Sequence, residues 1–209
     1  MPRATSDPHH GLWDLVVLCL LRERAMHPYE MQRLLVERHK DDVLVLKRGS
    51  LYHAIGRLQR AGLIATVETL RAGRRPERTI YRLTPDGRAA HLRWLQEMIA
   101  RPQPERSDFM ASISLLVYLA PADARARLEE RARALGAEIA ALESKLATLR
   151  ARLPRIHLVE LEYLLAMRRA EAAWVATVVP DLAAGSFTWD LEALLAALPA
   201  PGADPAETP

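Results

Sequence analysis

The chain of 209 residues contains a single cysteine and few aromatic residues, which make up 5% of it. No disulfide can form within the chain, and the place of Cys19 inside the apolar run 15–21 favours a buried, inert thiol over a nucleophile. The same run is too short to cross a bilayer, and residues 1–11 are polar, with no hydrophobic segment typical of a signal peptide. We therefore expect a cytoplasmic protein with no membrane partner.

The motifs that usually carry catalysis are also missing. The sequence has no glycine-rich phosphate loop, no HExxH and no CxxC pattern. His91 and His157 each stand alone in a helical stretch, and nothing near the pair His9-His10 completes a metal site. We expect no enzymatic activity, no metal and no cofactor.

Positive charge is concentrated in one part of the chain. Residues 47–82 hold nine Lys/Arg and two Asp/Glu, a net of +7, against +3 for the whole chain. The half from residue 100 onward is net −3, with 12 Lys/Arg and 15 Asp/Glu. Basic charge confined to one segment indicates a polyanionic partner there.

Hydrophobic periodicity predicts the order of elements in the first hundred residues. Alternation at 63–70 and 79–83 is typical of two strands, and the loop between them is rich in arginine. Thr84 followed by Pro85 is a helix start. We expect helices at 12–24, 28–38, 47–62 and 84–100, with the hairpin before the last of them.

The third helix is the strongest candidate for contact with DNA. Leu51, Ile55 and Leu58 recur at helical spacing and should face the core, leaving polar and cationic side chains on the open face. An ordinary surface helix would show the same stripe. The position of the third helix directly before a basic hairpin favours a winged helix-turn-helix. In that fold this helix lies in the major groove, and the hairpin tip lies at phosphates or in the minor groove.

The expected roles differ along this surface. Lys47 and Arg48 suit phosphates at a helix amino end, whereas Arg57 suits bidentate contact with guanine. For Tyr52 and Tyr29 the alternative is an aromatic ring packed against the protein. For the arginines of the loop between the two strands, the alternative is a solvated side chain. The candidate DNA contacts are Tyr29, Lys47, Arg48, Ser50, Tyr52, His53, Arg57, Arg74, Arg75 and Arg78.

The second half is predicted to be helical. Pro102 and Pro104 mark a boundary, because two prolines in three residues block a continuous helix. A helix is expected at 107–119, another with apolar heptads from 121 to Pro154, and a further one ending at Pro180. The heptad helix either pairs with its copy in a dimer or folds back on 157–180. Its candidate dimerisation residues are Leu128, Leu135, Ile139, Leu142, Leu146 and Leu149.

Large aromatics are rare enough to consider as a ligand site. Trp94, Phe109, Trp174 and Trp189 are candidates for an effector pocket between the two halves, with plain core or interface residues as the alternative.

Four blocks, in order, resemble the PadR family of bacterial transcriptional regulators. They lie at 27–31, 49–58, 61–64 and 81–87. The chain departs from the family pattern at Pro28, where glycine is usual, at Lys47-Arg48, where Ser-Pro is frequent, and at His53, where proline is usual. The resemblance implies a dimeric repressor that leaves DNA when a small ligand or a change in the cell acts on it.

These observations give one leading interpretation. The fold is mainly α with a two-stranded β wing. It comprises a tail at 1–11, a winged-helix DNA-binding domain at 12–100, a linker at 101–106, a helical coiled-coil dimerisation domain at 107–198 and a tail at 199–209. The function is regulation of transcription by a homodimer on an inverted-repeat operator in double-stranded DNA, with a small-molecule effector. The alternative is a winged-helix protein-interaction module that acts through its coiled coil.

Overall fold

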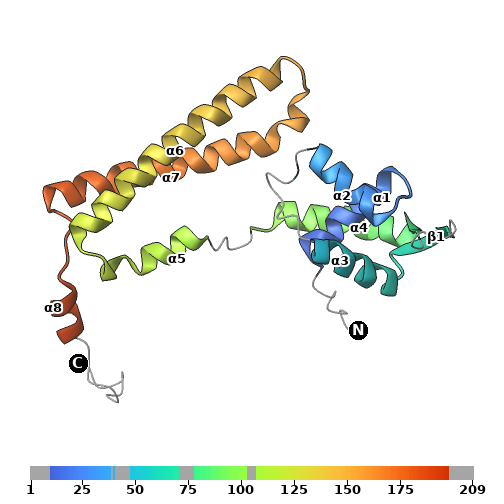
Figure 1. The fold of residues 1–209 in the computed structure, drawn as a ribbon, viewed down its shortest axis with the longest axis horizontal. Coiled ribbons are helices and arrows are strands. Elements are labelled where there is room, and N and C mark those ends of the chain that lie inside the picture. The colour runs from blue at the N-terminus through green and yellow to red at the C-terminus, as the bar shows by residue number, and fades with distance from the viewer. Residues whose placement is uncertain (1–9, 39, 41–47, 71–77, 103–106, 198–209) are drawn as a thin grey trace. The chain divides into compact units, whose positions relative to one another are not determined.

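The computed structural model describes residues 10–38, 40, 48–70, 78–102 and 107–197. Within them the chain is mostly helical and carries one two-stranded antiparallel sheet, which confirms the expected fold class (Figure 1). The contacts divide the chain into two compact units, Met1–Pro104 and Glu105–Pro209. Among the helices of these residues, none is long and apolar enough to cross a membrane.

The first unit has the expected order of three helices, a hairpin and a fourth helix. Helix α3 begins at Arg48, and Thr84 caps α4 by accepting a hydrogen bond from the Gly87 N–H at 3.0 Å. The elements are α1 (Leu12–Glu23), α2 (Pro28–Glu37), α3 (Arg48–Arg60), β1 (Ile64–Leu70), β2 (Arg78–Leu83) and α4 (Pro85–Ala100).

The core of this unit lies between α1, α3 and α4. Leu51, Ile55 and Leu58 of α3 are buried in it, as their spacing predicts. At the start of helix α1, Leu12 is 47% exposed and Asp14 is buried. Asp14 turns inward because its carboxylate accepts hydrogen bonds from the neighbouring Gly11 N–H and from Arg57, which is distant in sequence.

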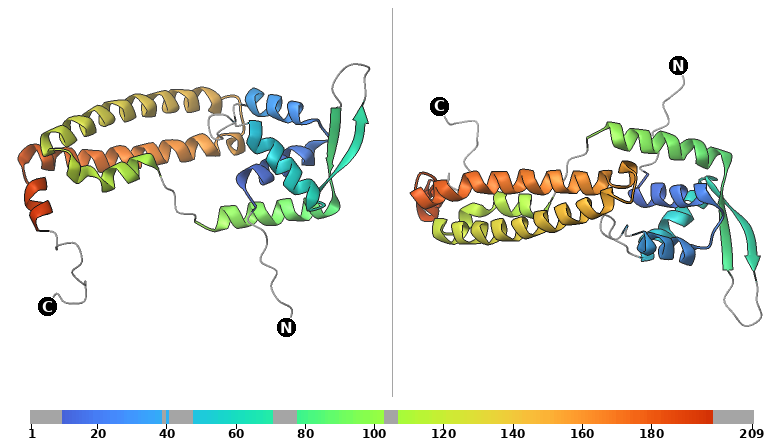
Figure 2. Two further views of the ribbon diagram at one scale, coloured as in Figure 1. Left: turned by 60° about the horizontal axis from the view of Figure 1, so that its bottom comes forward. Right: turned by 90° about the horizontal axis from the view of Figure 1, so that it is seen from above.

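The second unit is built on a long helical hairpin. Helices α6 and α7 run antiparallel side by side, and α5 lies along the hairpin in both views of Figure 2. The elements are α5 (Asp108–Ser114), η2 (Leu116–Tyr118), α6 (Pro121–Arg150), η3 (Arg155–His157), α7 (Val159–Ala184) and α8 (Leu191–Ala196). The single helix expected at 107–119 is therefore two short pieces.

The heptad leucines of α6 pack against the same chain. Leu128 and Leu135 share a cluster with Val175 and Leu182 of α7. The remaining four candidates lie in a second cluster with residues of the α7 amino end; they are Ile139, Leu142, Leu146 and Leu149. The structure matches the intrachain alternative at these six positions, because the turn at 151–158 returns α7 onto them. Their role in a dimer stays a prediction from the sequence.

Helix α7 does not end at Pro180 as expected. It continues to Ala184 and ends at Gly185, whose φ of 73° lies in the left-handed region. A proline inside a helix removes one N–H donor. Val175 before Pro180 and Leu182 after it are both buried against α6, and this packing keeps the last turn helical.

Candidate nucleic-acid interface

The outer face of α3 is polar and open to solvent. Tyr52 is 52% exposed and His53 is also exposed, whereas their neighbours Leu51 and Ala54 are fully buried. Ser50 is half-buried at the amino end of the helix. At this exposure Tyr52 fits both the DNA contact and the half-buried packing residue that its sequence position predicts, and its role stays a prediction.

Arg57 on the same face is held by a buried carboxylate. Its Nη2 donates to Asp14 Oδ1 at 2.8 Å and its Nε donates to Asp14 Oδ2 at 3.3 Å. The Arg57 side chain is 46% exposed and that of Asp14 only 5%. The edge of the guanidinium formed by Nε and Nη2 is thus occupied, while Nη1 and the second Nη2 hydrogen point away from Asp14.

Asp14 also joins α3 to the start of α1. Its Oδ2 accepts a hydrogen bond at 2.8 Å from the N–H of Gly11, the N-cap residue of α1. One carboxylate therefore caps one helix and orients an arginine on another. Sequence reasoning missed Asp14; the signal was an acid in the first turn of an otherwise apolar helix.

Five of the expected cationic contacts are described in part or not at all. Arg48 is the first residue of α3 and Arg78 the first of β2, and the structure describes the backbone of both. Lys47, Arg74 and Arg75 lie outside the described residues. The roles of all five remain predictions from the sequence.

The wing is a paired hairpin attached to the rest of the unit. Ile64 pairs with Leu83 and Thr66 with Tyr81, and the register shifts between Thr66 and Glu68. Tyr81 also exchanges two backbone hydrogen bonds with Met26, each 3.1 Å long. Met26, between α1 and α2, therefore forms an isolated β-bridge with the wing, which the sequence pattern did not predict.

The hairpin and α3 meet in a close junction. Gly62, with φ of 71°, ends the turn after α3, and the Thr84 hydroxyl donates to the carbonyl oxygens of Gly62 and Leu63, each at 2.9 Å. A Cβ on Gly87 would overlap the carbonyl oxygen of Leu63. Two of the sequence blocks that carry the family resemblance, 61–64 and 81–87, are thus interlocked and set the wing beside α3.

Tyr29 lies at the first turn of α2 and is 66% exposed. Its backbone N–H donates to the Nδ1 of His27 at 3.0 Å, which caps the helix. The exposed ring does not match the packed alternative. It is available to a partner from a second element of the same unit.

The four aromatics expected to share an effector pocket lie in different units. Trp94 is buried in the core of the first unit and stacks on His10, with ring centroids 4.4 Å apart. Phe109 and Trp174 contact each other edge-to-face in the second unit, with centroids 5.9 Å apart, and Phe109 and Trp189 pack against the same apolar cluster there. The structure thus places three of the four residues in one unit and assigns Trp94 to a core.

Two further polar groups meet inside the first unit. Cys19 Sγ and His91 Nε2 lie 3.1 Å apart, so His91 is not isolated as its sequence position suggested. Burial raises the pKa of the Cys19 thiol and lowers the pKa of the His91 imidazole. Both groups are therefore neutral near pH 7, which favours a structural role. No cluster of metal-ligating side chains occurs among the described residues.

Comparison with protein families gives a match over the first unit. Residues 17–93 match the model described as the Transcriptional regulator PadR-like family, which confirms the resemblance. A comparison with curated protein sequences gives no significant match.

Solved structures resemble the chain over most of its length. Bacillus subtilis PadR in complex with operator DNA has a TM-score of 0.64 at 20% identity, covering 84% of this chain and 99% of that one. The same protein in complex with p-coumaric acid has a TM-score of 0.64 at 18% identity, covering 82% and 99%. The Vibrio cholerae virulence activator AphA has a TM-score of 0.59 at 19% identity, covering 82% and 98%. At these identities the likeness shows a shared fold.

Proposed function

We propose that this chain, whose residues 17–93 are a PadR-like transcriptional regulator domain, is a dimeric repressor that binds an inverted-repeat operator in the cytoplasm. The observation that carries the proposal is the outer face of α3, where Tyr52, His53 and Arg57 project from a helix whose inner face is buried beside a hairpin wing. A small-molecule or stress signal releases the repressor. We assign DNA binding to residues 12–100 and dimerisation to residues 107–198.

In this proposal α3 enters the major groove. Arg57 reads a base with its free Nη1 edge, while Asp14 fixes the orientation of the guanidinium. Ser50 and His53 reach neighbouring base edges, and the Tyr52 hydroxyl reaches a phosphate while its ring packs on the sugar.

The remaining cations position the protein without reading sequence. Lys47 and Arg48 bind phosphate at the amino end of α3, and Tyr29 contacts the backbone from α2. Arg74, Arg75 and Arg78 bind phosphates at the wing tip. Two copies related by a two-fold axis place half-sites about one helical turn, 10–10.5 bp, or a multiple of it, apart.

The first test compares Arg57→Ala with Arg127→Ala in fluorescence anisotropy on DNA from upstream of the protein's own gene. Arg127 is an exposed arginine of α6 paired with Glu130, so both variants lose one cation. Loss of Arg57 should weaken specific binding about tenfold or more and relax the preference at one base pair, because a bidentate pair contributes about 1–3 kcal/mol of discrimination. Arg127→Ala should bind as the native chain does. Equal affinity of the native chain for scrambled DNA at about 150 mM salt contradicts the proposal.

The second test replaces Arg74, Arg75 and Arg78 together by Ala. Binding should weaken on all sequences alike, and the slope of log affinity against log salt should fall by up to about three. Unchanged affinity would mean that the wing does not clamp phosphates, and it would favour the protein-interaction alternative.

A further inference from the structure

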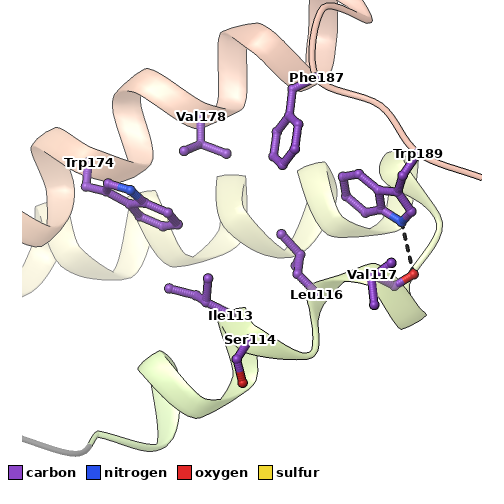
Figure 3. Close-up of a pocket in the computed structure, with 8 residues that line it drawn as sticks. All are labelled: Ile113, Ser114, Leu116, Val117, Trp174, Val178, Phe187 and Trp189. Atoms are coloured by element: carbon purple, nitrogen blue, oxygen red, sulfur yellow. Dashed lines mark hydrogen bonds between the residues drawn. The ribbon is translucent and has the colours of Figure 1, made fainter. Parts of the chain in front are cut away.

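The second unit contains an apolar pocket of about 310 Å³ (Figure 3). Trp174 and Val178 of α7 form one side of it, Phe187 and Trp189 after α7 form the end, and Ile113 and Leu116 close the opposite side. The volume falls at the lower end of the range for small-molecule sites. The pocket lies wholly within one unit.

The aromatic walls of the pocket are held in place before any ligand binds. The Trp189 Nε1–H donates to the carbonyl oxygens of Val117 at 3.0 Å and Leu119 at 2.9 Å, which fixes the indole against η2 (Figure 3). Phe187 packs against Trp189 with ring centroids 5.2 Å apart. Trp174 is held from behind by Phe109 at 5.9 Å. A preformed site loses little conformational entropy on binding.

The pocket lining offers nothing to a charged ligand. Its polar groups already have partners: the Trp189 indole as above, and the Ser114 hydroxyl, which donates to the carbonyl oxygen of Ala111 at 2.6 Å. The nearby Arg131 lies over the Phe109 ring at 3.4 Å and is paired with Glu171. An anion placed against these walls would lose part of its hydration without gaining a partner, which is unfavourable.

We propose that this pocket binds a neutral aromatic molecule and that this molecule is the effector of the regulator. The effector role rests on the proposed DNA-binding function, whereas the binding itself does not. Two tryptophans and a phenylalanine favour a flat ring by offset or edge-to-face contacts.

The test uses two probes that differ by one charged group. N-phenylnaphthylamine is neutral, and anilinonaphthalene sulfonate adds a sulfonate to the same ring system. In a fluorescence titration of the full chain, the neutral probe should bind at least about tenfold more tightly than the sulfonate, a free-energy difference of about 1.4 kcal/mol. Equal or tighter binding of the sulfonate overturns the proposal.

Substitutions at the pocket test whether the probe binds there. Val178→Trp fills the pocket and should lower the affinity for the neutral probe at least about tenfold. Ala176→Trp adds the same ring at an exposed position of the same helix and should leave binding unchanged. Circular dichroism melting is recorded for both variants. If Val178→Trp does not fold, Ser114→Arg at the exposed rim of the pocket tests the site instead. This variant should raise the affinity for the sulfonate. Failure of that variant to change the preference overturns the proposal.

Two controls ask whether the pocket stays open in the dimer and whether its ligand acts on DNA binding. If a second copy of the chain fills the pocket, binding of the neutral probe will weaken as protein concentration rises through dimerisation, and the proposal is overturned. Saturating neutral probe should lower affinity for the upstream DNA at least about tenfold, by linkage. A probe that binds in the pocket without this change overturns the effector role. Absence of specific DNA binding without probe is a failure of the proposed function, and it leaves the binding result intact.

Discussion

The carboxylate of Asp14 has two structural roles. It caps α1 and holds Arg57, and it is almost fully buried while doing so. A buried carboxylate is stable only when its oxygens accept hydrogen bonds, and here both do. The orientation of Arg57 on the outer face of α3 therefore depends on a residue that is itself almost fully buried.

Replacing Asp14 by asparagine tests this dependence. The change removes the charge from all three hydrogen bonds of Asp14, so the free energy of unfolding in urea should fall by about 2 kcal/mol. The matched control is Asp86→Asn in the exposed first turn of α4, which should lose only a few tenths of a kcal/mol. If both variants unfold at the same urea concentration, the Asp14 pair contributes nothing beyond a surface charge.

His91 predicts a pH dependence of stability. Burial holds its pKa below the ordinary value of 6.5 in the folded chain, so the unfolded chain takes up a proton first as pH falls. Stability should be greatest above pH 6.5 and should decline below it, down to the folded pKa. Cys19 at 3.1 Å and the charge of Arg22 both belong to this environment.

The measurement is the free energy of unfolding at about pH 7.5 and about pH 5.5 in the native chain and in His91→Gln. The variant should show a smaller difference between the two pH values, whatever its absolute stability. His157→Gln, at an exposed position of η3, should keep the native difference. An unaltered pH difference in His91→Gln would remove His91 as its source.

The wing and α4 are placed by close backbone contact. The Thr84 hydroxyl reaches the turn after α3, and α4 begins directly against the Leu63 carbonyl. Only glycine at position 87 permits that approach. The relative position of α3 and the wing thus depends on the contacts between the turn after α3, Thr84 and the first turn of α4.

Two glycine substitutions of the same kind should have opposite effects. Gly87→Ala forces Cβ against backbone that cannot rotate away, and should lower stability by about 3 kcal/mol or more. Gly136→Ala lies inside α6, where a Cβ meets nothing, and should raise stability by about 0.5–1 kcal/mol. Thermal melting of both variants checks the pair. A tolerated Gly87→Ala would mean that α4 shifts freely from the Leu63 carbonyl.

The molecule contains two units with separate hydrophobic cores. One core joins α1, α3 and α4, and the two clusters of the other lie along the α6–α7 hairpin. Since the heptad leucines pack inside the hairpin, we expect a dimer to form through other faces of the second unit. Tyr163 and Met167 of α7 are among its exposed large side chains, at 59% and 40%.

Sedimentation of the full chain and of a chain that ends at residue 104 tests the assignment of dimerisation. We expect a dimer for the full chain and a folded monomer for the short one, because the second unit is the proposed interface. Circular dichroism checks that the short chain is helical. A dimer that survives the truncation would exclude the second unit as the main interface.

The local sequence pattern was sufficient to predict most helices and strands of the first unit. Apolar spacing in α3, alternation in the wing and Thr84-Pro85 at the start of α4 each report a preference that acts within a few residues. The same reasoning identified the exposed face with Tyr52 and His53. It failed where the partner is distant in sequence: Asp14 lies 43 residues from Arg57, and Cys19 lies 72 from His91.

The sequence by itself determined the resemblance to the PadR family, the order of the elements in the first unit, the inner stripe of α3 and the uneven distribution of charge. Only the tertiary structure decided that Leu128 and its heptad neighbours face their own chain, that Trp94 belongs to a core and that Trp174 and Trp189 line a pocket. A heptad pattern predicts that an apolar stripe of the helix is buried, but it does not predict which helix buries it. The reason is that any apolar partner removes the same surface from water.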